Sequence, residues 1–232
     1  MKSSMQGVIL AGGMGTRLHP ITLEIPKPLL PVHRKPIIQY LVELFRASAV
    51  KEIFVLANRR DIGLFEKWKD EYNNREVILT KEEERLGTWG GVQKYLRDKL
   101  TDTFIVSNGD ELKEIDIDKL LTFHKANKAL ATVASIEVSN AKDYGVLVSD
   151  EKGRVKEFLY KPPSPPTNFI MSGIYAAEPK LFDFHFESDV ISFEEDVLPK
   201  IIDGDKLFEF KASGRWYDCG TFERYEKAIN EW

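Results

Sequence analysis

Small residues and two cations lie close together near the start of the chain, between Gly7 and Val32. The run Ala11-Gly12-Gly13-Met14-Gly15 follows three apolar residues, and such residues let backbone N–H groups approach phosphate oxygens without interference from Cβ atoms. Arg17 follows these glycines, and Lys27 lies between two prolines that keep it out of a regular helix. A phosphate-sized loop beside two positive charges is typical of nucleotide chemistry.

Two familiar phosphate loops do not fit this spacing. A dinucleotide fingerprint, G-x-G-x-x-G, would need glycine where the chain has Leu18, and no acidic residue follows in a clear ribose-binding context. A Walker A loop would need lysine after its last glycine, but Thr16 follows Gly15. The residues alone leave two interpretations open: a phosphate loop of another kind, or a strand-to-helix turn with Arg17 and Lys27 as surface charges.

The segments LAGGMGTRLHPIT and PKPLLPV together resemble the signature L-x-G-G-x-G-T-R-L-x-P-x-T…K-P-x-x-P-V of the sugar-1-phosphate nucleotidyltransferases, which make NDP-sugars. This family includes mannose- or heptose-1-phosphate guanylyltransferases and glucose-1-phosphate thymidylyltransferases. The resemblance runs through nearly all of the chain. It implies that Arg17 and Lys27 are catalytic and stabilise phosphates during transfer. It also implies that the nucleotide is bound by Leu10, Ala11, Gly12, Gly13, Gly15 and Thr16.

Composition excludes several other classes of protein. The formal net charge of −4 gives no electrostatic reason to expect a nucleic-acid or membrane partner. The single Cys219 excludes an internal disulfide and a cysteine zinc cluster, which fits a reducing compartment. The N-terminal MKSSMQ is too polar for a signal peptide, and no apolar run reaches the ~18 residues of a membrane span. We therefore expect a cytoplasmic protein.

Apolar runs alternate with helical patterns in the first part of the chain. Strands are predicted at Val8–Leu10, Ile53–Leu56 and Val77–Leu79, and helices at Ile37–Ala49 and about 61–72. This rhythm predicts an α/β fold with a Rossmann-like, mostly parallel sheet flanked by helices and ligands at the carboxyl ends of the strands. We expect a single domain over 1–232, with a nucleotide-binding half at about 5–135 and a sugar-phosphate-binding half, a small β subregion, at 136–232.

A second glycine-rich loop lies at Glu84–Val92 and enters a predicted helix. On sequence alone it could be a plain strand-to-helix turn. Its L-G-T-x-G pattern resembles the base-contacting loop of the family, most like members that use GTP or UTP. The resemblance implies that Gly87 and Thr88 bind the nucleotide, although Trp89 stands where a small residue is usual. GTP is the favoured nucleotide, and UTP and dTTP stay open.

A carboxylate ends the predicted strand at Thr103–Asp110. Mg²⁺ is typically held by one or two carboxylates together with substrate oxygens and water, although such an aspartate could also cap a turn or helix. The N-G-D sequence resembles the metal-binding motif of the family, which implies Asp110 as an Mg²⁺ ligand and Asn108 and Gly109 as nucleotide contacts. Further along, the pattern W-x-D-x-G-T implies Asp218 as the second Mg²⁺ ligand. Glu111, Asp116 and Asp118 are expected to be surface or capping charges.

The second half of the chain resembles the part of the family that binds the sugar phosphate. Lys161 matches the lysine of an E-K-P motif, but Tyr160 replaces its glutamate, and Met171 replaces the asparagine of an N-x-G-I-Y strand. These departures leave the identity of the sugar open. Glu194, in an F-E-x-D-x-L-P helix, fits a sugar contact or a surface charge equally well. The implied sugar-phosphate residues are Gly145, Tyr160, Lys161, Asn168, Ser172, Gly173 and Glu194.

The resemblance therefore implies a Mg²⁺-dependent nucleotidyltransferase whose partners are an NTP and a sugar-1-phosphate, in a homodimer or higher homo-oligomer. The competing class is a non-catalytic relative that binds nucleotide sugars and regulates another protein. Tyr160 and Met171 favour that alternative. Retention of Arg17, Lys27 and both aspartates argues against it.

Overall fold

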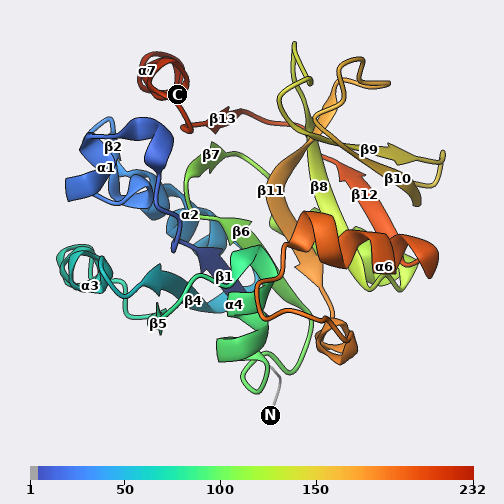
Figure 1. Ribbon diagram of the computed structural model, residues 1–232, viewed down its shortest axis with the longest axis horizontal. Helices are drawn as coiled ribbons and strands as arrows, with labels where there is room; N and C mark the ends of the chain where they lie inside the picture. The colour runs from blue at the N-terminus through green and yellow to red at the C-terminus, as the bar shows by residue number, and fades with distance from the viewer. Residues whose placement is uncertain (1–4) are drawn as a thin grey trace. The chain divides into compact units, whose positions relative to one another are not determined.

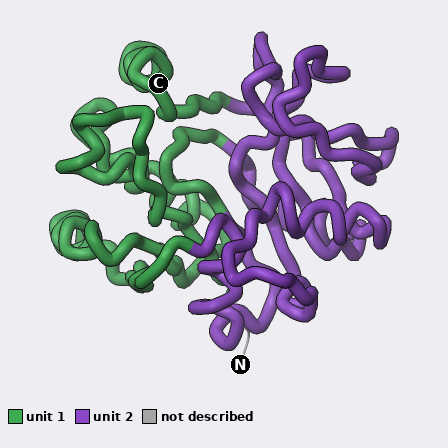
Figure 2. The backbone as a smooth tube through the Cα atoms, viewed as in Figure 1, with its two compact units in different colours: residues 1–85, 107–114, 215–232 green, residues 86–106, 115–214 purple. Residues whose placement is uncertain are grey.

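The computed structural model (Figure 1) describes residues 5–232. They form two compact units that are interleaved along the sequence (Figure 2). Unit 1 comprises the residues up to 85 together with 107–114 and 215–232, and unit 2 comprises 86–106 and 115–214. The glycine loop, Asp110 and Asp218 therefore all belong to unit 1. Of the polar N-terminal segment that argues against a signal peptide, residues 1–4 lie outside the described residues.

Three parallel strands form the centre of unit 1: β1 (Met5–Leu10), β4 (Val50–Asn58) and β5 (Val77–Glu82), with β4 in the middle. The apolar runs of β1 and β4 are largely buried, as in strands that are covered on both faces, whereas Ile78 on β5 is 37% exposed. Their carboxyl ends lie at one edge, because Leu10 pairs with Leu56 and Asn58 pairs with Glu82. The three predicted strands are confirmed, and each is longer than its apolar run.

Two amphipathic helices in unit 1 bury their apolar side chains. The apolar side chains of α2 (Ile37–Arg46) recur at helical spacing and are buried, and α3 (Ile62–Glu71) buries Phe65 and Trp68. Gln39 Oε1 on α2 accepts hydrogen bonds from Trp68 Nε1 at 3.1 Å and Asn74 Nδ2 at 2.9 Å, so these buried polar groups are satisfied. Both predicted helices are confirmed, with α2 ending at Arg46.

Short elements carry the chain from the glycine loop to α2. They are η1 (Thr16–Leu18), α1 (Ile21–Glu24), η2 (Lys27–Leu29), β2 (Pro31–Val32) and β3 (Lys35–Pro36). Lys27 thus lies in a single 3-10 turn, since the flanking prolines do not continue a helix.

The last segment of the chain completes unit 1. Strand β7 (Glu111–Lys113) pairs antiparallel with β13 (Trp216–Asp218), and α7 (Phe222–Glu231) follows. Cys219 and Ala228 from this segment are buried in one apolar cluster with Leu18, Val32, Ile37 and other residues of the first 40. Burial raises the pKa of the Cys219 thiol to about 12, so this side chain is part of the core rather than a reactive group.

Unit 2 combines helices with mixed strand pairing. Strand β8 (Ala131–Glu137) is antiparallel to β11 (Phe169–Ala177) and parallel to β12 (Leu207–Lys211), while β9 (Gly145–Ser149) is antiparallel to β10 (Val155–Tyr160). The remaining elements are α4 (Gly87–Leu96), α5 (Ile117–Asn127), η3 (Pro179–Asp183), η4 (Phe193–Val197) and α6 (Leu198–Asp203). Strand β6 (Phe104–Asn108) leads from this unit into unit 1.

The predicted α/β class, with a mostly parallel sheet flanked by helices, is confirmed. Asp116 caps α5 as expected, because its carboxylate accepts the Lys119 N–H at 2.9 Å. The division into halves near residue 135 stays a prediction. Within residues 5–232, no helix combines the length and the hydropathy that crossing a bilayer requires.

Candidate active site

The glycine loop lies at the carboxyl end of β1. Its first residue, Ala11, donates its N–H to the Leu56 carbonyl at 2.8 Å, and Gly109 donates to the Leu10 carbonyl at 2.9 Å. Gly15 has a φ of 60°, and a Cβ there would lie 2.9 Å from Thr22 Cγ2, so this position requires glycine. A Cβ at Gly13 would meet nothing within 4 Å, which leaves that part of the loop open.

A carboxylate lies against the same loop. Glu82, the last residue of β5, places its Oε2 atom 2.1 Å from where a Cβ at Gly12 would be, so a side chain at position 12 would displace this carboxylate. Burial raises the pKa of the Glu82 carboxyl to about 7. This carboxyl therefore changes charge near neutral pH.

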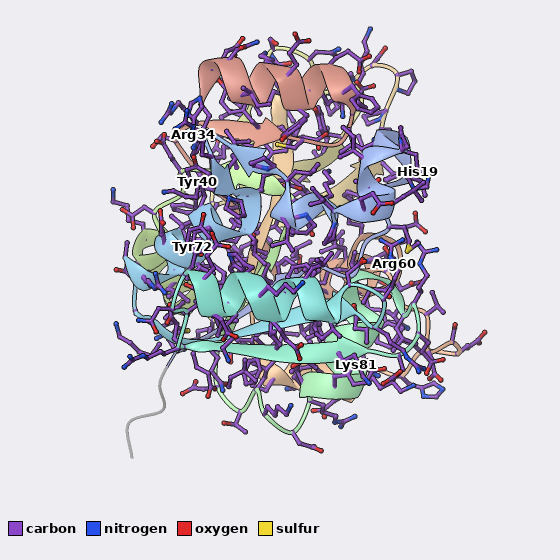
Figure 3. The ribbon with its side chains drawn as sticks, turned by 90° about the vertical axis from the view of Figure 1, so that its left-hand side faces the viewer. His19, Arg34, Tyr40, Arg60, Tyr72 and Lys81 are labelled. Carbon is purple, nitrogen blue, oxygen red and sulfur yellow. The ribbon has the colours of Figure 1, made fainter. Side chains whose placement is uncertain are left out.

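Side chains around these strand ends lie on one side of unit 1 (Figure 3). Arg60, just after β4, and Lys81, near the end of β5, lie toward the same side of the view as His19, which follows the glycine loop. Arg34 and Tyr72 lie toward the opposite side. The loop and Glu82 thus belong to the edge where ligands bind in parallel α/β sheets.

Lys27 forms ion pairs with both of the aspartates that are expected to bind metal. Its Nζ atom is 2.7 Å from Asp110 Oδ2 and 3.6 Å from Asp218 Oδ1, and only 7% of its side chain is exposed. Burial alone would lower the pKa of Lys27, but Asp110 and Asp218 outweigh it and the pKa is raised. Burial likewise acts to raise the pKa of Asp110, yet Lys27 lowers it overall. Lys27 and Asp110 are therefore both held in their charged forms.

Strand pairing brings Asp218 to this cluster, because Asp218 on β13 lies opposite Glu111 on β7. A Cβ at Gly220 would lie 2.7 Å from Asp218 Oδ1 and 3.1 Å from Arg17 Nη2, so the Asp218 carboxylate and the Arg17 guanidinium converge on this glycine. Arg224 Nη1 donates to Asp218 Oδ2 at 2.7 Å. Unit 1 thus gathers Arg17, Lys27, Asp110 and Asp218 into one charged cluster.

The expectation that Glu111 is a surface or capping charge is wrong. Its carboxylate accepts hydrogen bonds from Asn108 Nδ2 at 2.9 Å and from Lys113 Nζ and Trp216 Nε1 at 3.0 Å. The Lys113 side chain is fully buried. Burial raises the pKa of Glu111, and the charge of Asp110 adds to the effect. The β7–β13 pairing covers this residue, which a reading of the isolated loop could not foresee.

In unit 2, Gly87 and Thr88 begin α4. Gly87 has a φ of 77°, and a Cβ there would lie 2.4 Å from the Ile191 carbonyl oxygen. Thr88 Oγ1 accepts a hydrogen bond from the Phe193 N–H at 2.8 Å. Trp89 is fully buried and stacks on Phe182 with a centroid separation of 5.3 Å. The large residue at position 89 is therefore accommodated in the core of this unit.

The expected sugar residues of unit 2 lie mostly on β9, β10 and β11. A Cβ at Gly145 would lie 2.7 Å from the Phe158 ring and 3.4 Å from Met171 Sδ, so an aromatic ring and a thioether flank this glycine. Tyr160 is 54% exposed, and Lys161 holds its Nζ 4.9 Å from the centroid of that ring. Lys161 itself has a φ of 45°, which directs the chain out of β10.

The other expected sugar residues have different surroundings. The Ser172 side chain is fully buried and donates to the Ala134 carbonyl at 2.7 Å, so its hydroxyl is already engaged. Gly173 has a φ of 64° where β11 is irregular, and the Asn168 carbonyl accepts the Val138 N–H at 3.0 Å. Glu194 lies in η4.

A family model described as nucleotidyl transferase matches residues 6–232. The chain belongs to the nucleotidyl transferase family. It is similar to the mannose-1-phosphate guanylyltransferase of Mycobacterium tuberculosis, with 33% identity over 225 residues that cover 95% of this chain and 62% of that protein. A probable mannose-1-phosphate guanylyltransferase 2 of Oryza sativa subsp. japonica is 36% identical, over 95% of this chain and 63% of that protein. The chain thus spans less than two thirds of the length of these curated relatives.

Solved structures match over nearly the whole of both chains. HddC from Yersinia pseudotuberculosis, in a complex with GMP-PN, is 30% identical with a TM-score of 0.81, over 98% of this chain and 99% of that chain. A UDP-glucose pyrophosphorylase in a complex with UDP-glucose has the same TM-score of 0.81 at 23% identity, over 98% of each chain, and shows the shared fold alone.

The carboxylates of this nucleotidyl transferase suit a hard cation. Asp110 and Asp218 already share one positive group, the Lys27 ammonium, and carboxylate oxygens are the protein ligands that Mg²⁺ prefers. Among residues 5–232, no group of three or more His, Cys, Asp or Glu side chains is arranged to hold a metal ion. Two carboxylates would leave the remaining positions of a magnesium ion to substrate oxygens and water.

Proposed function

We propose that this nucleotidyl transferase joins an NTP to a sugar-1-phosphate, with release of pyrophosphate. A phosphate oxygen of the sugar-1-phosphate would attack the α-phosphorus of the NTP, and the bond to the β-phosphate oxygen would break. The observation that supports this most strongly is the cluster of Lys27, Asp110 and Asp218 beside Arg17, in a family member with a glycine loop at the same edge.

The attacking oxygen needs no general base, because the phosphate of the sugar is ionised at neutral pH. Catalysis would then come from alignment and from neutralisation of charge. In this proposal the backbone of the glycine loop binds the triphosphate, and Arg17 and Lys27 stabilise charge on the transferred group and the pyrophosphate. Lys27 is held charged by its carboxylate partners, which suits this role.

We propose Mg²⁺ as the cofactor, held by Asp110 and Asp218. When bound, the ion would neutralise phosphate charge and align the reacting groups. In this proposal the carboxylates of Asp110 and Asp218 hold the ion. The Lys27 ammonium then shifts in part from these carboxylates to phosphate oxygens of the substrates.

We propose GTP as the preferred nucleotide. Guanine presents two adjacent N–H donors on its Watson–Crick edge, and an ionised carboxylate can accept both, whereas uracil and thymine present one. Glu82 offers such a carboxylate against the glycine loop. The similar mannose-1-phosphate guanylyltransferases and the HddC complex with GMP-PN support the same choice.

For the sugar, we propose a substrate other than glucose-1-phosphate. Lys161 would bind the sugar phosphate and Gly145 the ring, while Phe158, Tyr160 and Met171 offer rings and a thioether rather than hydrogen-bonding groups. Such a surface favours a sugar with a different substituent pattern, such as mannose, a heptose, or an amino or deoxy sugar. The names of the curated relatives favour the manno configuration.

The test is a pyrophosphate-release assay of the purified protein with GTP, UTP, dTTP and ATP, each against a panel of sugar-1-phosphates. Release that depends on both substrates is expected, with GTP the fastest. Lys27→Met should abolish it. Lys119→Met, which removes an exposed ion pair with Asp116, serves as the matched control and should behave like the wild type.

Binding of nucleotide without pyrophosphate release from any pair would contradict the proposal and favour the non-catalytic alternative. A cytoplasmic location and a homo-oligomeric state stay predictions. Fractionation and analytical ultracentrifugation would measure them.

A further inference from the structure

Asp218 is held from both sides in unit 1. Its Oδ1 atom faces the Lys27 ammonium at 3.6 Å, and its Oδ2 atom accepts from Arg224 Nη1 at 2.7 Å. Only 13% of the Asp218 side chain and 27% of the Arg224 side chain are exposed. A partly buried, charge-assisted hydrogen bond of this length restricts the carboxylate more than a surface ion pair would.

The helix that carries Arg224 is itself fixed at its start. Thr221 caps α7, since its hydroxyl accepts the Arg224 N–H at 3.3 Å and its carbonyl accepts the Tyr225 N–H at 2.9 Å. Arg224 lies in the first turn of α7, where the helix dipole disfavours a cation. Its contact with Asp218 offsets that local penalty.

We propose that Arg224 is a positioning residue that orients the Asp218 carboxylate for the divalent cation. By holding Oδ2, Arg224 leaves Oδ1 toward Lys27, which also contacts Asp110. This inference rests on the proposed role of Asp110 and Asp218 in metal binding. Residues that orient a metal ligand from behind commonly change metal affinity by ~10- to 100-fold when they are removed.

The experiment measures binding of Mn²⁺, as a paramagnetic probe for Mg²⁺, to the purified protein without substrates, by electron paramagnetic resonance. Arg224→Met is expected to raise the Mn²⁺ dissociation constant about tenfold. Arg224→Lys keeps the charge but loses the planar fork, so an intermediate affinity is expected. Lys227→Met is the matched control: it removes a cation from the same helix, where Lys227 is 60% exposed and its nearest carboxylate is Glu231 at 3.9 Å.

A purely structural role predicts a different result. In that case Arg224→Met would lower the melting temperature while its Mn²⁺ affinity stayed at the wild-type value, and the proposal would be overturned. Tighter Mn²⁺ binding in Arg224→Met would also overturn it, because Arg224 would then compete with the metal. The proposal would be overturned as well if Asp218→Asn bound Mn²⁺ like the wild type, because Asp218 would then not be a metal ligand.

Steady-state assays provide a second readout. Arg224→Met should need about ten times more Mg²⁺ for half-maximal activity, with kcat near the wild-type value at saturating Mg²⁺. An inactive wild type across all substrate pairs would refute the proposed transferase function. The Mn²⁺ measurement would still decide the role of Arg224, so the two failures can be told apart.

Discussion

Replacement of Glu82 by glutamine tests the proposed choice of nucleotide directly. The two side chains have nearly the same size, so the close contact with Gly12 is retained. A carboxylate can accept two N–H donors, but an amide offers one acceptor and one donor. The variant would therefore lose one charge-assisted hydrogen bond to guanine and place an N–H against an N–H.

The magnitude follows from the burial of this group. A hydrogen bond to a charged group contributes roughly 1.5–3 kcal/mol, and each 1.36 kcal/mol is about a factor of ten in rate. We expect kcat/KM for GTP to fall roughly 10- to 100-fold in Glu82→Gln. With UTP, whose base presents a single N–H between two carbonyl groups, kcat/KM should be unchanged or higher.

The pH dependence is a second signature of the same residue. Burial raises the pKa of Glu82 to about 7, so the carboxylate that accepts from guanine is lost as the pH falls through 7. For the wild type, kcat/KM with GTP should rise across this range, and this rise should be absent in Glu82→Gln. Because the folded-state pKa lies above the unfolded value, the charge of Glu82 also costs stability as the pH rises from about 4.5 to 7.

The assay is pyrophosphate release from pH 5.5 to 8.5 with GTP and with UTP. Glu83→Gln is the matched control, since Glu83 is the next residue and pairs with Lys81 on the surface. If the ratio of the GTP and UTP values of kcat/KM is the same in wild type and Glu82→Gln, Glu82 does not contact the base and the reasoning is refuted.

Asp110→Asn and Asp218→Asn should each lower turnover by orders of magnitude with an unchanged circular dichroism spectrum; near-normal activity in both would remove the metal assignment. The folded-state pKa of Asp110 lies below its unfolded value, so the wild type should lose stability as the pH falls below about 4, and Asp110→Asn should lose less in acid denaturation. Gly15→Ala should destabilise the fold by roughly 1 kcal/mol or more in urea, because φ is positive and Thr22 is close; an unchanged midpoint would argue against that conformation. Tyr160→Glu should shift the preference among sugar-1-phosphates toward glucose-1-phosphate, and an unchanged preference would mean that Tyr160 does not face the sugar.

Much of unit 1 could be predicted because its signals are local. Val8–Leu10 and Ile53–Leu56 are unbroken apolar runs, and a buried parallel strand requires such runs. Helix α2 repeats its apolar residues at helical spacing. The run of small residues from Ala11 to Gly15 predicts a loop, and the structure has a loop there, with Gly15 in the left-handed region.

Most contacts in the site depend on strand pairing and strand order, which no local pattern contains. The resemblance pointed to Lys27, Asp110 and Asp218, but their shared ion pairs depend on the pairing of β7 with β13. Glu82 lies 70 residues after Gly12, and only the order of β1, β4 and β5 explains their contact. The pairing of β7 with β13 also covers Glu111, so the sequence alone wrongly predicts a surface or capping charge there. A carboxylate that ends a strand beside a glycine loop is the signal that could have identified Glu82.

The segments that form unit 1 are synthesised at different times. Its first segment ends at residue 85 and its last begins at 215, roughly 130 residues later, so synthesis at about 5–20 residues per second separates them by roughly 6–26 s. Until then, the apolar side chains that pack on Cys219 and Ala228 have no partner from the last segment, and Lys27 lacks Asp218. The nascent chain cannot form the complete charge cluster before Asp218 has been synthesised, so a chain truncated upstream of Asp218 lacks the contact between Lys27 and Asp218.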